Sequence, residues 1–190
     1  DPDKQESETY DLWVAGTQVK KTNQKDVLDD GTVSYDPNTH TLTLNNAYLT
    51  PDGDANFTYC IDSELTDMLT ITGTATLSNA DGILTDGPLT LNNADLTITG
   101  NIDGDIGEDA IRAGRSDEDI TIQNSTVTIA GTNAEGNFFN FGIRCGKLTV
   151  ANSTLDVKVY GSAIVADELK ASGAGTVITA ETDASEEQDY

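Results

Sequence analysis

The sequence predicts an all-β protein, a single-stranded parallel β-helix (solenoid) with an N-terminal β-hairpin cap. Three observations lead to this prediction. A short motif that alternates apolar and polar residues recurs along the chain. A second apolar mark precedes each later copy, at intervals of roughly 20 to 30 residues, which is the period of solenoid repeats. The 190-residue chain also has only four prolines and no convincing amphipathic helix.

The cap is expected at residues 10–44, after a polar segment, residues 1–9, that we expect to be disordered. Residues 10–14 alternate apolar and polar, residues 15–18 form a turn sequence, and residues 33–42 repeat the pattern around the type I turn sequence Asp-Pro-Asn-Thr. Two hairpins are therefore predicted. An open solenoid end would expose apolar core and unpaired strand edges, which Trp13 and Tyr35 would cover.

The repeats themselves occupy residues 45–180, so that residues 10–180 are expected to form one domain. Copies of the motif begin at Leu42, Leu69, Leu89, Ile120, Leu148 and Leu169. Period-2 alternation places the leucines and isoleucines on one face. Parallel strands lie about 4.8 Å apart, so equivalent residues should form columns through the interior. The columns Leu69, Leu89, Ile120, Leu148, Leu169 and Ile71, Leu91, Ile122, Val150, Ala171 are the clearest.

Asparagine recurs at the bend inside the motif, at Asn93, Asn124 and Asn152. Asparagine tolerates the left-handed backbone that a tight bend requires, and stacked amides can hydrogen-bond into an asparagine ladder. In the shorter copies, Gly73 and Gly173 take this position, and glycine adopts the left-handed backbone readily. These residues therefore favour a role in the fold over a role in binding.

Charge and cysteine content narrow the functional classes. The net charge of -23 argues against a nucleic-acid partner, which requires clustered basic residues. The sequence contains no run of about 18 apolar residues, the length that a membrane-spanning helix needs, so we predict no insertion into a membrane. Cys60 and Cys145 lie three turns apart, about 14 Å, so we predict two unpaired, buried thiols. Residues 181–190 read as an acidic mobile tail, and the lack of a second cap after Thr179 is consistent with a natural chain that continues.

Several segments resemble a known family. The opening YDLWVAGTQV, the segment GTVSYDPNTHTLTLNNA and the later G-I-R and L-T-[IV]-x-N-[AS] motifs resemble the extracellular right-handed parallel β-helix modules of gut Firmicutes, described as carbohydrate-binding domain-containing surface proteins. The resemblance covers about residues 10–180. It implies a right-handed coil and a bacterial cell-surface or secreted location. It also implies binding of a polysaccharide, such as pectin or polygalacturonate, or of a host surface glycan.

We expect a monomeric, non-catalytic module, with two alternatives left open. One is a structural stalk or adhesin domain, and the other is a polysaccharide lyase or glycoside hydrolase. His40 is the only histidine and lies in the cap, which argues against a serine or cysteine triad and a histidine-based metal centre. Among 33 acidic residues, a pair of carboxylates carries almost no specific signal for a glycosidase.

Arg112 and Arg144 are the first candidate site, because each follows an Ala-Ile or Gly-Ile mark in consecutive turns. Their side chains should stack at about 5 Å and need a counterion. The acidic segment 116–119 is one partner, and the carboxylate of a uronic acid, bound in bidentate fashion, is the other. Asp119, Lys147 and Glu168 also occupy equivalent positions and predict an exposed charge ladder.

Two insertions supply the remaining candidates. Oxygen ligands at Asn101, Asp103, Asp105 and Asp109, with glycines between them, could surround a calcium ion, although the spacing departs from the EF-hand pattern. The other interpretation is a solvated acidic loop. Phe138 and Phe139 could stack on a sugar ring, or could cover the core. Insertions in repeat proteins often gather on one binding face.

Overall fold

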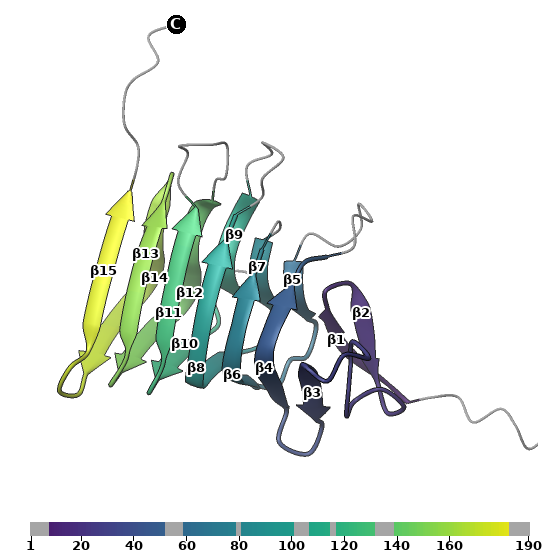
Figure 1. Ribbon diagram of the computed structural model, residues 1–190. Helices are drawn as coiled ribbons and strands as arrows, with labels where there is room; N and C mark the ends of the chain where they lie inside the picture. Colours follow the sequence, from purple (N-terminus) through teal and green to yellow (C-terminus); the bar gives the residue numbers. More distant parts are fainter. Residues whose placement is uncertain are drawn as a thin grey trace, which may run out of the picture.

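The computed structural model describes residues 8–51, 59–78, 81–100, 107–114, 117–131 and 139–182. All regular secondary structure in these residues is β-strand, and most strand pairs are parallel (Figure 1). The prediction of an all-β chain with parallel pairing is therefore confirmed. In the same residues, no helix exists that is long and apolar enough to cross a membrane.

Fifteen strands are present in the described part of the chain. In order they are β1 (Thr9–Val14), β2 (Thr17–Lys20), β3 (Val33–Asp36), β4 (Thr41–Leu49), β5 (Tyr59–Ser63), β6 (Leu69–Leu77), β7 (Asp81–Thr85), β8 (Leu89–Thr99), β9 (Gly107–Ala113), β10 (Ile120–Gln123), β11 (Thr126–Gly131), β12 (Phe139–Ala151), β13 (Thr154–Val159), β14 (Ser162–Ser172) and β15 (Val177–Thr182).

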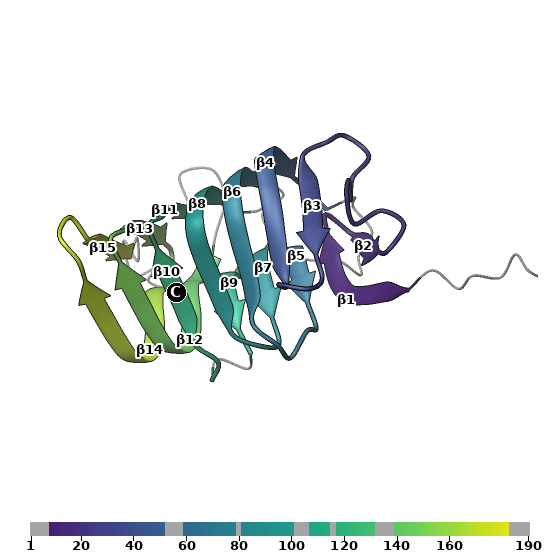
Figure 2. The same cartoon turned by 90° about the horizontal axis from the view of Figure 1, so that it is seen from below.

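The strands form three rows that the chain visits in turn. The first row contains the starts of β4, β6 and β8, then β10 and the ends of β12 and β14. The second contains the ends of β4, β6 and β8, then β11, β13 and β15. The third contains β5, β7, β9 and the starts of β12 and β14. Figures 1 and 2 show the strands stacked along one axis, from β1–β3 to β14–β15.

The predicted interior columns are present in register. Leu69 pairs with Leu89, Leu89 with Ile120, and Ile120 with Leu148, and all four are buried. Leu148 pairs in turn with Leu169. The structure corrects one expectation here, because Leu169 belongs to the last level and is 51% exposed. A column is buried only where another level covers it.

Both cysteines are free and buried, as predicted. Burial raises the pKa of the Cys60 thiol to about 12 and that of Cys145 to about 11. The Cys60 thiol lies 3.3 Å from the carbonyl oxygen of Leu49, to which it donates a hydrogen bond. These thiols therefore behave as small apolar side chains of the core.

The bends between the first and second rows have the predicted left-handed backbone. The φ angles are 50°, 51°, 51° and 49° at Asn46, Asn93, Asn124 and Asn152, and 95° and 91° at Gly73 and Gly173. The expected amide ladder, however, is not formed. The side chains of Asn93, Asn124 and Asn152 are exposed, and in the described structure no hydrogen bond joins one of these amides to another.

Serine side chains add hydrogen bonds that link successive bends. Ser125 Oγ accepts a hydrogen bond from the backbone N–H of Ala94 at 3.0 Å, and Ser153 Oγ accepts one from the N–H of Ser125 at 3.0 Å. Both serines are buried. The serines that follow Asn124 and Asn152 therefore each satisfy a buried backbone donor of the level before them.

The N-terminal cap consists of the two predicted antiparallel hairpins. β1 pairs with β2 and β3 pairs with β4, and β1 also continues the third row by pairing antiparallel with β5. Tyr35 is buried and its ring contacts Tyr10 edge to face, with centroids 5.3 Å apart. Burial raises the pKa of Tyr35 to about 12. At this end, the apolar interior is covered.

Candidate functional site

Arg112 and Arg144 form the predicted pair of stacked arginines, here called the arginine pair. They occupy paired positions on the neighbouring strands β9 and β12. A small residue lies two positions before each arginine, Ala110 in β9 and Gly142 in β12. An added Cβ at Gly142 would lie 2.4 Å from the carbonyl oxygen of Ala163, so only glycine allows the next level to approach there. The repeat thus places both guanidinium groups on the third row.

The carboxylate between the arginines comes from Asp109. Arg144 donates to it through Nε and Nη2, at 2.5 Å to Oδ1 and 2.5 Å to Oδ2, in the bidentate geometry of a strong ion pair. Arg112 Nη1 lies 3.8 Å from Oδ2. The Asp109 side chain is completely buried, whereas those of Arg112 and Arg144 are 24% and 21% exposed. The sequence interpretation missed this pairing and assigned Asp109 to a calcium loop.

The two arginines are unequally engaged. Both oxygens of Asp109 are held by Arg144, which makes Arg144 the counterion of a buried charge. Arg112 donates one hydrogen bond, from Nε to the carbonyl oxygen of Gly114 at 3.1 Å. Among the described residues, neither Nη group of Arg112 donates a hydrogen bond. Counting only the described side chains, the arginine pair therefore carries one positive charge more than Asp109 neutralises.

The aromatic residue beside the arginine pair is Phe141, not either predicted phenylalanine. The Arg144 guanidinium carbon lies 4.3 Å above the centre of the Phe141 ring, a cation–π contact. Phe139 is 0% exposed and cannot stack on a ligand from solvent, so its assignment as a ligand-binding residue is wrong. It belongs to the core, which was the alternative interpretation. Phe138 lies outside the described residues.

The proposed calcium ligands are only partly placed. Asn101, Asp103 and Asp105 lie outside the described residues. Asp109 is placed, and its assignment as a calcium ligand is corrected, because Arg144 occupies both of its carboxylate oxygens. Within the part of the chain that the structure describes, no group of three or more His, Cys, Asp or Glu side chains could hold a metal ion.

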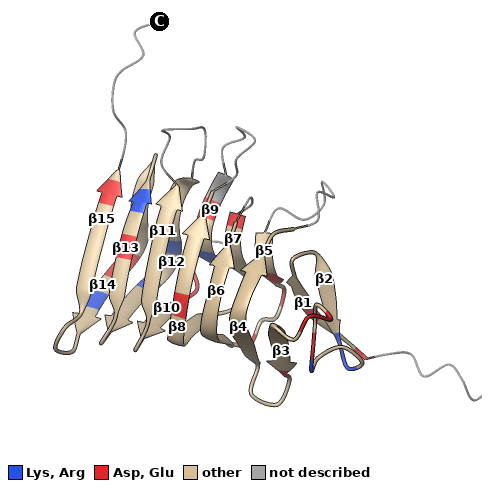
Figure 3. Ribbon diagram, in the orientation of Figure 1, with Lys and Arg blue, Asp and Glu red and all other residues tan. Residues whose placement is uncertain are grey.

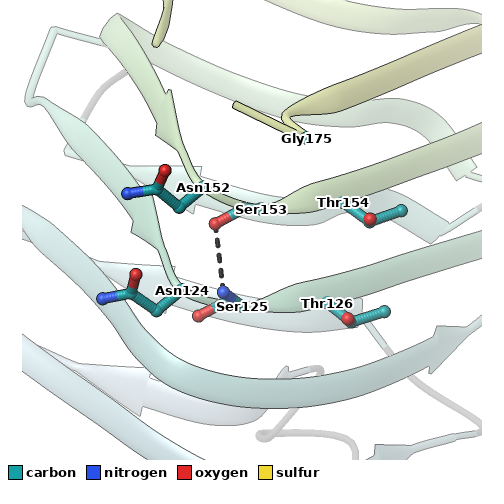
Figure 4. A pocket seen from close by; sticks show the side chains of 7 residues that line it. All are labelled: Asn124, Ser125, Thr126, Asn152, Ser153, Thr154 and Gly175. Atoms are coloured by element: carbon teal, nitrogen blue, oxygen red, sulfur yellow. Dashed lines mark hydrogen bonds between the residues drawn. The ribbon is translucent and has the colours of Figure 1, made fainter. Parts of the chain in front are cut away.

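A second feature is a shallow polar hollow of about 360 Å³ at the bends of the last levels. It is lined by Asn124, Ser125, Thr126, Asn152, Ser153, Thr154 and Gly175 (Figure 4). The figure shows Asn124 and Asn152 projecting the same way from successive levels, with the Ser125–Ser153 hydrogen bond between them. No lining residue is charged or aromatic. The arginine pair is therefore the better candidate for binding an anionic ligand.

The predicted charge ladder exists in part. Lys147 Nζ lies 3.9 Å from Glu168 Oε2, and Lys170 Nζ lies 3.0 Å from Glu168 Oε1. Asp119 makes no ion pair with the described residues. These pairs are half exposed and contribute little to stability.

No family model, no curated protein and no solved structure matches this chain. The functional argument therefore rests on the arginine pair and its surroundings.

Proposed function

We propose that the chain is a right-handed, single-stranded parallel β-helix module of a bacterial surface or secreted protein, and that it binds an acidic polysaccharide through Arg112. The resemblance noted in the sequence supports the handedness, the location and the ligand class. The order of the three strand rows and the parallel register of their strands support the helix. The binding role is carried by one observation: among the described residues, Asp109 neutralises only one of the two positive charges of the arginine pair.

The chemistry of the pair suits a uronic acid. Arginine presents planar N–H donors that match the two oxygens of a carboxylate. In the described structure the Nη groups of Arg112 donate no hydrogen bond, and Arg144, held by Asp109 and Phe141, is the neighbour beside which a ligand would bind. On a chain with a net charge of -23, such a site would bind an anion only through specific contacts, since the long-range field repels it.

The geometry gives the hydrolase alternative no comparable support. A glycosidase needs one carboxyl group that reaches the glycosidic oxygen and a second one near the sugar. Asp109, whose carboxylate pairs with the arginines, is completely buried and bound in bidentate fashion. The Asp109 carboxylate pairs with the arginines, and a substrate could not contact it.

The test is calorimetric titration of the protein with oligogalacturonate, in parallel with a fully methyl-esterified oligogalacturonate that lacks the charge. We expect the charged ligand alone to bind, and Arg112→Ala to weaken its binding at least tenfold. Lys158→Ala removes the same charge from an exposed residue on β13 and should bind like the parent. Arg112→Ala should cost about 1 kcal/mol of stability, because it removes one hydrogen bond.

Two results would contradict the proposal. Equal weakening by Lys158→Ala would show nonspecific attraction between charges. No binding of oligogalacturonate by the parent, with or without millimolar calcium, would leave the stalk or adhesin interpretation in its place. The calcium arm also tests the loop at residues 101–105, which lies outside the described structure.

A further inference from the structure

A column of half-buried side chains runs along the outer face of the third row, and the arginine pair belongs to it. The strands β1, β5, β7, β9 and β12 lie side by side in this row (Figure 2). Their register aligns five residues, here called the outer column: Trp13, Asp62, Leu84, Arg112 and Arg144. All five are half-buried, whereas the residue before or after each of them on the inner face is buried in the core.

From Arg112, a ligand finds further side chains along the stack and not along the strand. Side chains two residues apart in a strand point to the same face, so the neighbours of Arg112 within the chain are Ala110 and Gly114. Both are small and buried. In the stacking direction, by contrast, Leu84 and Asp62 follow at intervals of about 4.8 Å. Among the described residues, a polymer bound at Arg112 therefore gains most contacts by running parallel to the stack.

Trp13 is the aromatic member of the outer column, on the side of the cap. It is the only tryptophan of the chain, and it lies three levels from Arg112, a distance of about 14 Å. An aromatic ring offers a large apolar surface on which a sugar ring can stack. Leu84 adds an apolar side chain between the two. The outer column thus combines a guanidinium group with apolar contacts for a polymer of sugars.

The charge of the outer column changes sign along its length. Asp62 lies two levels from Arg112, about 10 Å away. Within the described structure, Asp62 forms no ion pair. Burial raises the pKa of its carboxyl group, and Glu64 and Asp86 raise this pKa further, so the three acids share one negative field. A carboxylate is therefore attracted at the level of Arg112 and repelled at the level of Asp62.

We propose that an acidic polysaccharide bound at Arg112 runs along the outer column to Trp13, and that Asp62 selects an uncharged sugar at its own level. This inference rests on the binding role of Arg112 proposed above. The ligand is then a polysaccharide in which neutral residues separate the charged ones, such as a partly esterified polyuronate. A fully charged polyuronate places a carboxylate beside Asp62 and binds less tightly. Asp62 is therefore the residue that determines specificity.

Tryptophan fluorescence tests the course of the ligand, because Trp13 is the only source of the signal. Galacturonic acid, a single ring, should leave the emission unchanged, since it cannot extend from Arg112 to Trp13. A partly methyl-esterified oligogalacturonate long enough to span about 14 Å should shift the emission. Arg112→Ala should abolish this shift at the same ligand concentration. An oligomer that binds through Arg112 in calorimetry and leaves the emission of Trp13 unchanged would overturn the inference.

Calorimetry with two oligogalacturonates of equal length, one fully charged and one partly methyl-esterified, tests the selection by Asp62. The parent should bind the partly esterified oligomer about fivefold more tightly, because one close repulsion is absent. Asp62→Asn should remove most of this preference by improving the binding of the fully charged oligomer. Asp156→Asn removes an exposed carboxylate on β13, in another row, and should leave the preference unchanged.

The outcomes separate this inference from the proposed function. Equal affinity of the parent for both oligomers overturns the role of Asp62 and leaves the role of Arg112 standing. An equal gain in Asp62→Asn and Asp156→Asn does the same, because it reports only the net charge of the chain. Binding of neither oligomer by the parent overturns both proposals. Binding that Arg112→Ala does not weaken also overturns both, since it places the ligand elsewhere.

Discussion

At the scale of single residues, the main finding is that one buried carboxylate organises two arginines. Asp109 is completely buried and receives two hydrogen bonds from Arg144. Arg112 is held mainly by the carbonyl of Gly114. The two arginines have the same place in the repeat, yet Arg144 neutralises a buried carboxylate, whereas Arg112 donates one hydrogen bond to a backbone carbonyl. Their substitutions should therefore have different consequences.

Arg144→Ala should destabilise the protein by about 3 kcal/mol or more, because it leaves the Asp109 charge buried without its partner. Urea unfolding measures the effect. The double variant Asp109→Asn/Arg144→Ala should recover much of the loss, since no charge then remains to be compensated. A loss below about 1 kcal/mol for Arg144→Ala would show that the carboxylate does not depend on this guanidinium.

The carboxyl group of Asp62 predicts that the free energy of unfolding depends on pH. Burial raises the pKa of its carboxyl group above the usual value, and the nearby Glu64 and Asp86 raise it further. Between the usual and the raised pKa, the native state binds more protons than the unfolded state. This group therefore makes the free energy of unfolding rise as the pH falls through that window.

Asp62→Asn should accordingly be more stable than the parent at neutral pH, and the difference should shrink as the pH falls through the raised pKa. Urea unfolding at a series of pH values measures it. Asp156→Asn, at an exposed residue on β13, removes the same charge and is the matched control. A stability difference for Asp62→Asn that is constant over the whole pH range would refute the raised pKa.

At the scale of the elements, the bends between the first and second rows combine two independent devices. Asparagine or glycine supplies the left-handed backbone of the bend. The serine that follows Asn124 and Asn152 satisfies a buried N–H of the preceding level. The first device acts within one level, and the second connects levels.

Ser125→Ala should destabilise the protein by about 1–3 kcal/mol, because the buried N–H of Ala94 loses its acceptor. Thr126→Ala, one residue later and exposed, should change stability by less than about 0.5 kcal/mol. Thermal or urea unfolding of both variants makes the comparison. Equal effects would mean that the serine hydroxyl is not required between the levels.

At the scale of the whole molecule, the high negative charge of the chain opposes the folded state. A stack of strands with one covered end exposes an elongated surface, and the chain carries a net charge of -23. Figure 3 shows acidic residues along much of this stack. Repulsion among them should oppose the compact state and is weakened by salt, because the Debye length falls from about 10 Å at 0.1 M to about 3 Å at 1 M.

We therefore expect the midpoint of thermal unfolding to rise as sodium chloride is increased with a chelator present. The measurement is a thermal melt at one fixed protein concentration. Equimolar potassium chloride should give the same shift, since screening does not depend on the monovalent cation. A midpoint that falls with salt would mean that ion pairs such as Asp109–Arg144 outweigh the general repulsion.

The sequence by itself determined the strands, their parallel register and the cap, because these follow from local alternation and from a repeat that each level copies. Leu69, Leu89, Ile120 and Leu148 lie in one buried column for this reason. The left-handed asparagines and the two unpaired cysteines follow from the same periodicity. The spacing of the repeats also predicted that Arg112 and Arg144 occupy equivalent positions.

Only the tertiary structure decided which side chains those positions meet. Asp109 turns to the arginines, Phe139 enters the core while Phe141 contacts Arg144, and serine rather than asparagine links the bends. Each outcome depends on contacts between side chains of different levels, and alternation within one strand does not specify those contacts. The exposure of Leu169 has a related cause. Its sequence context is that of a buried residue, and burial requires a further level that the fold does not provide within the described chain.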